Sequence, residues 1–272
     1  MIPQPSWAAK LLYYLLPIRR QVIRENIAIA YGDTLGADEK KRLHQAFCGH
    51  FLKMVGEGLT MGFLPDEAVR KRIRIVGEEH LWEASRGGKG IILLGGHFGN
   101  FELSPVAGIL NFPQFKGRFH PLRRNIGNKL VERTLFSRFY RSGLDIIPKK
   151  NSLNRVLDAL ASNDVVAFIM DQYARTDRDG IAVEFFGKKT GTFKSLAHIA
   201  RASGAPVIPA VCWREPDGTH VMEFRAPVPW VADPDPDREI YLNTLGYNRI
   251  LESFVLAHPE QWWWVHRRWK NK

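Results

Sequence analysis

Short apolar runs alternate with helical segments along the chain from about residue 78 onward. Gly90–Leu94 and Val165–Met170 contain no charged side chain. Runs of this length are typical of strands that are buried on both faces of a sheet. Between the runs, segments such as Leu153–Ala161 carry apolar residues at the three- and four-residue spacing of a helix. The alternation predicts an α/β fold, with a mixed, mostly parallel central sheet flanked by helices.

The predicted elements can be assigned to residue ranges. We expect core strands over 73–76, 90–94, 115–120, 144–147, 165–170, 182–185, 206–213 and 220–226. We expect helices between them over 81–85, 101–110, 126–142, 153–161, 195–203 and 238–256, and earlier helices over 6–16, 18–31 and 37–63. We therefore divide one continuous domain into a helical N-terminal membrane-associating segment, residues 1–72, and an α/β core, residues 73–272.

The charge of the chain indicates an anionic partner. Lys and Arg number 39 against 28 Asp and Glu, which gives a net charge of +11. Such a surplus suits anionic lipid headgroups, an acidic carrier protein or nucleic acid. The chain has no zinc-finger spacing, RNP-type aromatic block or KH loop, so we expect no nucleic-acid partner. Trp262, Trp263, Trp264 and Trp269 lie close to several basic residues, a combination that suits a membrane interface or the lid of an acyl groove. Packing on the core is the structural alternative, and we expect a mixture of these roles.

The first apolar segment is too short to span a bilayer. Trp7 to Leu16 falls well below the ~20 apolar residues that a spanning helix needs, and it contains Lys10. Two interpretations stay open: an interfacial helix with Leu11, Leu12, Leu15 and Leu16 toward the acyl chains, or an ordinary amphipathic helix packed on the domain. The two cysteines, Cys48 and Cys212, form no C-x-x-C pair, so no metal site is expected.

The segment Gly95–Glu102, Gly-Gly-His-Phe-Gly-Asn-Phe-Glu, follows a predicted buried strand. Its glycines permit an unusual turn between that strand and the next helix. If the helix begins near Asn100, Glu102 can reach back to the His97 imidazole. A carboxylate on one ring nitrogen leaves the other free to accept a proton from a hydroxyl. The pattern predicts His97 as a general base oriented by Glu102; the structural alternative is a packing histidine beside a helix N-terminal acid.

Other candidate site residues follow from the expected position of the ligand, beyond the carboxyl ends of the strands. Glycine-turn N–H groups can stabilise an oxyanion, arginines can bind phosphate, and the Asp-Gln pair after residue 170 can position an acceptor or support its loop. The structural alternatives are that the glycines only form the turn and that the arginines lie on a solvent-exposed helix face. The candidates for substrate binding are Gly96, Asn100, Arg123, Arg138, Arg141, Asp171 and Gln172.

Gly95–Glu102 resembles the H-x-x-x-x-D/E motif of glycerolipid acyltransferases. It is most similar to the lipid A biosynthesis (lauroyl/myristoyl) acyltransferase family, whose relatives include phosphatidylinositol mannoside acyltransferases. The resemblance covers about residues 18–270. Further blocks occur in the family's order: Phe119-His120-Pro121, Met170-Asp171-Gln172, Phe185-Phe186-Gly187, Gly204-Ala205-Pro206-Val207-Ile208-Pro209 and Pro259–Lys270. One departure is His120, where relatives commonly carry Arg; Arg123 and Arg124 are nearby cations that can replace it.

The resemblance implies transfer of a fatty acyl group from acyl carrier protein or coenzyme A to a hydroxyl of a membrane glycolipid such as a lipid A precursor. It also implies a place at the cytoplasmic face of a bacterial inner membrane, with no metal and no bound organic cofactor. Many relatives begin with a fuller membrane-spanning helix, whereas this N-terminus offers about ten apolar residues, so we expect peripheral or monotopic attachment. A lysophospholipid or glycerol-phosphate acyltransferase is the nearest alternative. An acyl-thioester hydrolase is another, because His97 can activate water as well as an alcohol. A serine esterase is disfavoured because the chain has no G-x-S-x-G motif.

Overall fold

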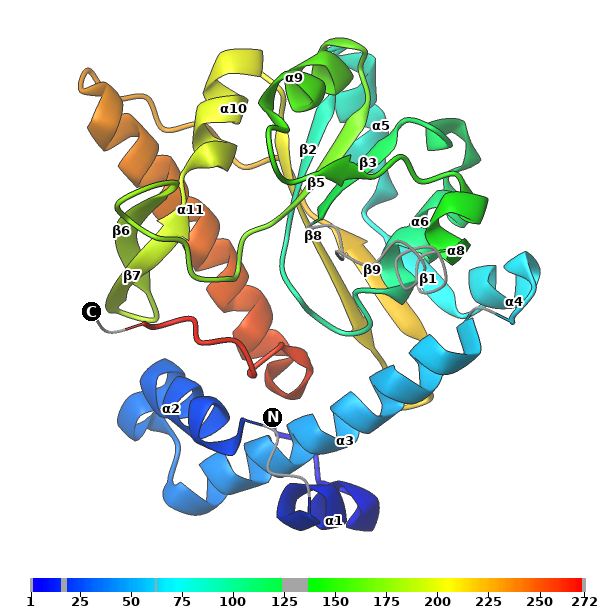
Figure 1. Cartoon of the computed structure of the whole chain (residues 1–272), viewed down its shortest axis with the longest axis vertical. Coiled ribbons are helices and arrows are strands. Elements are labelled where there is room, and N and C mark those ends of the chain that lie inside the picture. The colour runs from blue at the N-terminus through cyan, green and yellow to red at the C-terminus, as the bar shows by residue number, and fades with distance from the viewer. Residues whose placement is uncertain (1, 16–18, 62, 124–136, 271–272) are drawn as a thin grey trace.

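The structure is a computed structural model that describes residues 2–15, 19–61, 63–123 and 137–270. Its centre is a seven-stranded sheet in the order β1-β9-β8-β2-β5-β3-β4 (Figure 1). Only β8 and β9 pair antiparallel in this sheet; its other neighbouring strands are parallel. The strands are β1 Ile73–Val76, β2 Ile91–Gly95, β3 Phe119–Arg123, β4 Ile147–Pro148, β5 Val165–Ile169, β8 Val207–Arg214 and β9 His220–Phe224. The predicted mixed, mostly parallel sheet is confirmed.

Both faces of the sheet are covered because the strands are apolar on both sides. In β2, Ile91 and Leu93 join one hydrophobic cluster, whereas Ile92 and Leu94 join another, as the two-residue period of a strand requires. The first cluster contains side chains of α5 Glu78–Arg86, α6 Leu103–Asn111 and α8 Ser137–Ser142. The second contains side chains of α9 Leu153–Ala161, α10 Ser195–Ser203 and α11 Pro236–Ala257.

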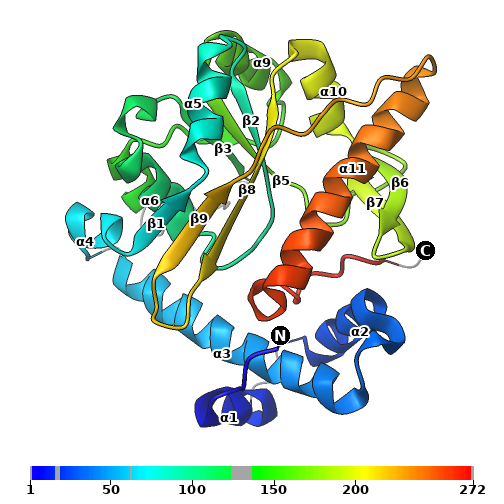
Figure 2. The ribbon, with the colours of Figure 1, turned by 180° about the vertical axis from the view of Figure 1, so that it is seen from behind.

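A second, two-stranded sheet packs against α11 (Figure 2). It consists of β6 Gly180–Phe185 and the antiparallel β7 Lys188–Phe193. The sequence predicts β6 but not β7, whose Lys-Lys-Thr-Gly-Thr-Phe has little hydrophobic pattern. β7 is held by specific polar contacts instead: Arg268, which is fully buried, donates to the Gly191 carbonyl at 2.7 Å and to Thr192 Oγ1 at 2.6 Å.

The tryptophans near residue 265 belong to the core. Trp262 and Trp264 are almost completely buried, as is Trp269, and only Trp263 of the group is half-buried. The interpretation of this segment as a membrane-interface anchor is therefore wrong for three of the four rings. The rings pack with Phe185 and with one another, so aromatic packing explains their number.

Four helices precede the sheet: α1 Trp7–Leu15, α2 Arg20–Tyr31, α3 Ala37–Met61 and the short α4 Asp66–Arg70, which the sequence does not predict. α1 packs on α3 (Figures 1 and 2). Leu12 of α1 is buried there whereas Leu11 and Leu15 are exposed, and Leu16 lies outside the described residues. Among the helices described, none is both long and apolar enough to cross a membrane.

Several predicted boundaries shift. The strand expected over 115–120 begins later, at Phe119, because a 3-10 helix occupies Pro113–Phe115, and the strand expected over 144–147 is reduced to Ile147–Pro148. Two further 3-10 helices, Gly32–Thr34 and Pro259–Gln261, follow α2 and α11. Most of the helix expected over 126–142, together with Arg124, lies outside the described residues.

The turn after β2 depends on one glycine. Gly99 has a φ of +54°, and a Cβ at this position would lie 2.3 Å from the Cys212 carbonyl oxygen of β8. A non-glycine residue is disfavoured by the positive φ and is then blocked by backbone atoms that cannot rotate away. The close approach lets the Gly99 N–H donate to the Gln261 carbonyl at 3.0 Å, and the Gly99 carbonyl lies 3.1 Å from His50 Nε2.

We predict that Gly99→Ala lowers the free energy of unfolding by about 3 kcal/mol or more, the sum of the positive-φ cost and the overlap with β8. Gly88→Ala is the matched control, because Gly88 has a φ of +68° but nothing within 4 Å of an added Cβ. We expect Gly88→Ala to lose only about 1–2 kcal/mol. Urea denaturation measures both, and equal losses would contradict the role given to the close approach.

Candidate active site

His97 and Asp171 meet at the carboxyl edge of the sheet. β2 and β5 are parallel neighbours, and Gly95 is paired with Ile169 at their ends. His97 and Asp171 each lie two residues beyond this pair, so the register brings them side by side. His97 Nδ1 is 2.7 Å from Asp171 Oδ1, and the His97 backbone N–H donates to Asp171 Oδ2 at 2.8 Å.

Asp171 is enclosed by donors. Its side chain is only 3% exposed, and Trp262 Nε1 adds a third hydrogen bond, to Oδ2 at 2.8 Å. Burial alone would raise the pKa of this carboxyl. The charge of His97, two hydrogen bonds from His97 and the one from Trp262 outweigh burial and lower the pKa to about 2. Asp171 is therefore an anion throughout the physiological pH range.

The position of Asp171 fixes the state of the imidazole. A carboxylate can only accept, so Nδ1 of His97 carries the proton and Nε2 presents its lone pair when the ring is neutral. Burial is the largest influence on this ring and lowers its pKa, but the charge and hydrogen bond of Asp171 and the charge of Glu102 together raise the pKa above its ordinary value. The side chain is 22% exposed. The result is a partly exposed imidazole with a raised pKa, whose Nε2 lies 3.4 Å from Gln172 Nε2.

Glu102 has a different role from the one predicted. The ring nitrogen that we expect Glu102 to hold is bonded to Asp171, so the assignment of Glu102 as the orienting acid is corrected. Glu102 immediately precedes α6 and acts on His97 through its charge. Burial raises the pKa of Glu102, and the charges of Arg123 and His97 partly offset this. Glu102 is the predicted partner because it is close to His97 in the sequence. The register of the parallel strands decides the contact instead, since it joins residues 74 positions apart.

Asn100 belongs to the scaffold of the site. It is 1% exposed, its Oδ1 accepts from the Leu103 N–H at 3.0 Å, and its Nδ2 donates to Glu57 Oε2 at 2.8 Å. Glu57 on α3 also accepts from Arg214 Nε at 2.8 Å and Nη2 at 2.5 Å. The expectation that Asn100 binds substrate is therefore corrected: its polar groups connect the start of α6 to α3 and β8.

Of the three arginine candidates, Arg123 lies close enough to Glu102 for its charge to act on that carboxyl. Arg138 is buried and donates to the Leu64 carbonyl at 3.0 Å and to Asp66 Oδ1 at 2.6 Å. Its predicted phosphate contact is therefore corrected to a structural role that fixes α8 to the segment before α4. Arg141 is exposed on α8, and its predicted role stays a prediction.

Gly96, Asp171 and Gln172 lie around His97. Gln172 Nε2 is 3.4 Å from His97 Nε2, so it is beside the proton-accepting atom. Gly96 has no room for a side chain, because a Cβ would lie 2.7 Å from the Phe98 ring. Of the two roles open for Asp171, contact with the acceptor or support of the site, its contacts favour the supporting one, since both of its oxygens are bonded within the chain and hold His97. The sequence does not predict Trp262 as a site residue. Its place in the C-terminal block is the one feature of the sequence that could have indicated this role.

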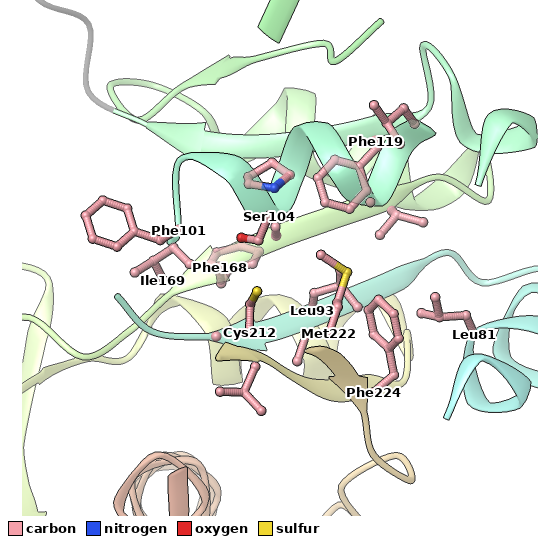
Figure 3. A pocket seen from close by; sticks show the side chains of 18 of the residues that line it. Leu81, Leu93, Phe101, Ser104, Phe119, Phe168, Ile169, Cys212, Met222 and Phe224 are labelled. Carbon is pink, nitrogen blue, oxygen red and sulfur yellow. The ribbon is translucent and has the colours of Figure 1, made fainter. Parts of the chain in front are cut away.

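An apolar pocket begins at Gly95 and Gly96, immediately before His97. It encloses about 840 Å³, part of it open to solvent, and extends between α6 and the sheet. Figure 3 shows Phe101 and Ile169 at one end and Leu81 toward the other, with Met222 and Phe224 along the way. Its lining is almost entirely aliphatic or aromatic, which suits a long hydrocarbon group.

Neither cysteine has the properties of a nucleophile. Both are buried, and burial raises the pKa of the Cys48 thiol to about 11 and that of Cys212 to about 12. Among the residues that the structure describes, no three His, Cys, Asp or Glu side chains are grouped as a metal site requires.

Comparisons with known proteins match the chain to acyltransferases. A family profile described as bacterial lipid A biosynthesis acyltransferase matches residues 6–271. The lipid A biosynthesis lauroyltransferase of Escherichia coli K12 is 25% identical over 97% of this chain and 83% of its own length, and the palmitoleoyltransferase of the same organism is 25% identical over 93% and 79%. A phosphatidylinositol mannoside acyltransferase of Mycolicibacterium smegmatis is 24% identical over 72% and 64%.

A solved structure is also similar. It is the 1-acyl-sn-glycerophosphate acyltransferase PlsC of Thermotoga maritima, with a TM-score of 0.42 and 14% identity over 92% of this chain and 96% of that one. The family profile covers nearly all of the residues that build the sheet, the histidine–aspartate pair and the apolar pocket. The chain belongs to the bacterial lipid A biosynthesis acyltransferase family, and it is an acyltransferase.

Proposed function

We propose that this protein transfers a fatty acyl group from an acyl thioester, carried by acyl carrier protein or coenzyme A, to a hydroxyl of a membrane glycolipid such as a lipid A precursor. The single observation that carries the proposal is the position of His97, which is held by Asp171 and packs against Phe101, a residue that lines the apolar pocket. A base that serves acyl transfer must meet both a polar acceptor and the end of a hydrocarbon chain, and this edge of the sheet offers both.

The reaction follows from the protonation states of the pair. Neutral His97 accepts the acceptor's hydroxyl proton at Nε2 while the hydroxyl oxygen forms a bond to the thioester carbonyl carbon. The tetrahedral intermediate then expels the thiolate, which takes the proton from the imidazolium, so that an ester and a thiol are released. Asp171 stabilises the imidazolium through the Nδ1 hydrogen bond, and the negative charge of Glu102 contributes at longer range.

The relatives support a glycolipid acceptor. Their names specify lipid A and phosphatidylinositol mannoside as the molecules that they acylate, and both are glycolipids. Lauroyl and palmitoleoyl are the acyl groups in the names of the two Escherichia coli enzymes. The apolar pocket beside His97 supports a chain of this kind here. An acidic carrier protein is a suitable donor for a protein with a net charge of +11.

We further propose attachment to the cytoplasmic face of a bacterial inner membrane, without spanning it. The exposed apolar side chains of the first helices support contact with a lipid surface. On α1, Trp7 is 78% exposed. On α3, Leu52, Val55 and Leu59 are all exposed and recur at spacings of three and four, so they lie on one helix face. Exposed apolar rows near basic side chains bind at the boundary between headgroups and acyl chains.

Acyl transfer is tested with purified protein and a radiolabelled acyl thioester. We expect labelled glycolipid only when an acceptor lipid is present, and we expect His97→Ala to reduce its formation by at least about 10³-fold, because no other group replaces the base. Circular dichroism checks that the variant is folded. Free fatty acid released equally with and without acceptor would identify a hydrolase, and full activity of His97→Ala would contradict the mechanism.

We predict that Asp171→Asn lowers kcat by about 10²–10⁴-fold, because Nδ1 loses its anionic acceptor. Glu102→Gln, which removes another carboxylate whose charge acts on His97, is the matched comparison and has a smaller effect on kcat. His97 must be neutral to act, so activity rises with pH through its raised pKa. Losing the charge of Glu102 lowers that pKa and moves this rise to lower pH. pH profiles of kcat and kcat/KM measure the loss of turnover and the shift of the rise. A larger loss of kcat in Glu102→Gln than in Asp171→Asn would restore Glu102 as the orienting acid.

We predict that Gly108→Leu shortens the preferred acyl chain. Gly108 lines the pocket from α6, and an added Cβ lies 3.5 Å from Met222 Cε, so the larger side chain occupies space in the pocket. Each methylene that is excluded costs about 1–3 kcal/mol, so kcat/KM for the longest substrates should fall by about tenfold or more relative to short ones. Gly246→Leu on α11, where nothing lies within 4 Å, is the control. An unchanged chain-length profile would contradict the pocket's role.

A further inference from the structure

A basic groove lies beside the catalytic pair. Its described lining is Arg19, Arg20, Gln21, Val22, His266, Arg267 and Lys270, and it encloses about 1230 Å³, much of it open to solvent. Four of these side chains are cations, and no acidic side chain is among them. Since the cations come from two segments that are far apart in the sequence, the fold concentrates positive charge here.

The groove is connected to the catalytic residues through His266. The Tyr173 N–H donates to His266 Nε2 at 3.0 Å, and Tyr173 follows Asp171 and Gln172 on the same loop. The charges of Asp171 and His97 both act on His266, so the groove lies within electrostatic reach of the pair. Burial is the main cause that lowers the pKa of His266 to about 4. His266 is therefore neutral near pH 7, and the charge of the groove comes from Arg and Lys.

Two of the cations hold the groove in shape. Arg19 Nη1 donates to the Val265 carbonyl at 3.2 Å, and Arg20 donates to the backbone carbonyls of Tyr13 and Tyr14. Arg267 and Lys270 are exposed, and Lys270 Nζ lies 5.1 Å from the centre of the Tyr173 ring. α2 also begins at this groove, so the positive end of its dipole adds to the charge of the side chains.

We propose that this groove binds a phosphate-bearing part of a substrate during acyl transfer. Arg and Lys are the side chains that bind phosphate oxygens most strongly, and several cations without an acidic partner match a group with more than one negative charge. The inference rests on the proposed function. Two sources carry this chemistry: the phosphates of the thioester carrier, as in coenzyme A, and a phosphorylated headgroup of the acceptor lipid.

The experiment measures binding without turnover. Every variant is the full chain carrying His97→Ala. The groove pair, Arg267→Gln with Lys270→Gln, removes two exposed cations of the groove. Arg86→Gln with Lys89→Gln is the matched control, because these exposed cations lie before β2, at the opposite end of that strand from His97. One probe is coenzyme A, measured by titration calorimetry. The other is vesicles of phosphatidylcholine with and without phosphatidic acid, measured by sedimentation.

We expect the groove pair to weaken binding of one probe by about tenfold or more relative to the control pair. A selective loss for coenzyme A assigns the groove to the donor; a selective loss for phosphatidic acid vesicles assigns it to the acceptor headgroup. The charge-preserving pair Arg267→Lys with Lys270→Arg should retain binding and shows that a loss is not due to misfolding. Equal binding by the groove and control pairs for both probes would overturn the proposal.

These outcomes are independent of the acyl-transfer test. If no labelled glycolipid forms in that test but the groove pair still loses a probe, the proposed function fails and the phosphate site stands. If transfer is observed but neither probe distinguishes the pairs, the site fails alone.

Discussion

The buried carboxylate of Asp171 is the interaction on which the site depends. It accepts hydrogen bonds from the ring and the backbone of His97 and from the Trp262 indole, and it is nearly inaccessible to water. A buried anion is stable only when donors or cations compensate it, so each of these partners is held in place by the others. The carboxylate therefore fixes the tautomer of the base and also joins the β2 loop, the β5 loop and the C-terminal segment.

A second, partly buried polar group also holds this turn. Glu57 of α3 pairs with Arg214 at the end of β8 and accepts from Asn100 just before α6. Arg214 donates its backbone N–H to Gln261 Oε1 as well. The helix that exposes an apolar row is thus bonded to the residues that shape the catalytic turn. Contact of α3 with a lipid surface would place the turn close to that surface.

Much of the architecture is predictable from the sequence because it depends on local patterns. α9 and α10 are found at the predicted residues, β2 is shifted by one residue, and β5 ends one residue earlier than predicted. Two features that the sequence does not predict have a common cause, because each depends on a partner far along the chain. β7 is stabilised by Arg268, and the pairing of His97 with Asp171 results from the register of two strands. The sequence identified both Asp171 and Glu102, but only the register decides which carboxylate holds the ring.

The packing of Trp262, Trp264 and Arg268 has a consequence for biosynthesis. A nascent chain that has emerged only as far as α11 already contains the residues of every strand, but it lacks the indole that donates to Asp171 and the guanidinium that secures β7. His97 and Asp171 can reach their final environment only after Trp262 has left the ribosome. Until Trp262, Trp264 and Arg268 emerge, the aromatic core around Phe185 is incomplete and β7 lacks its guanidinium donor.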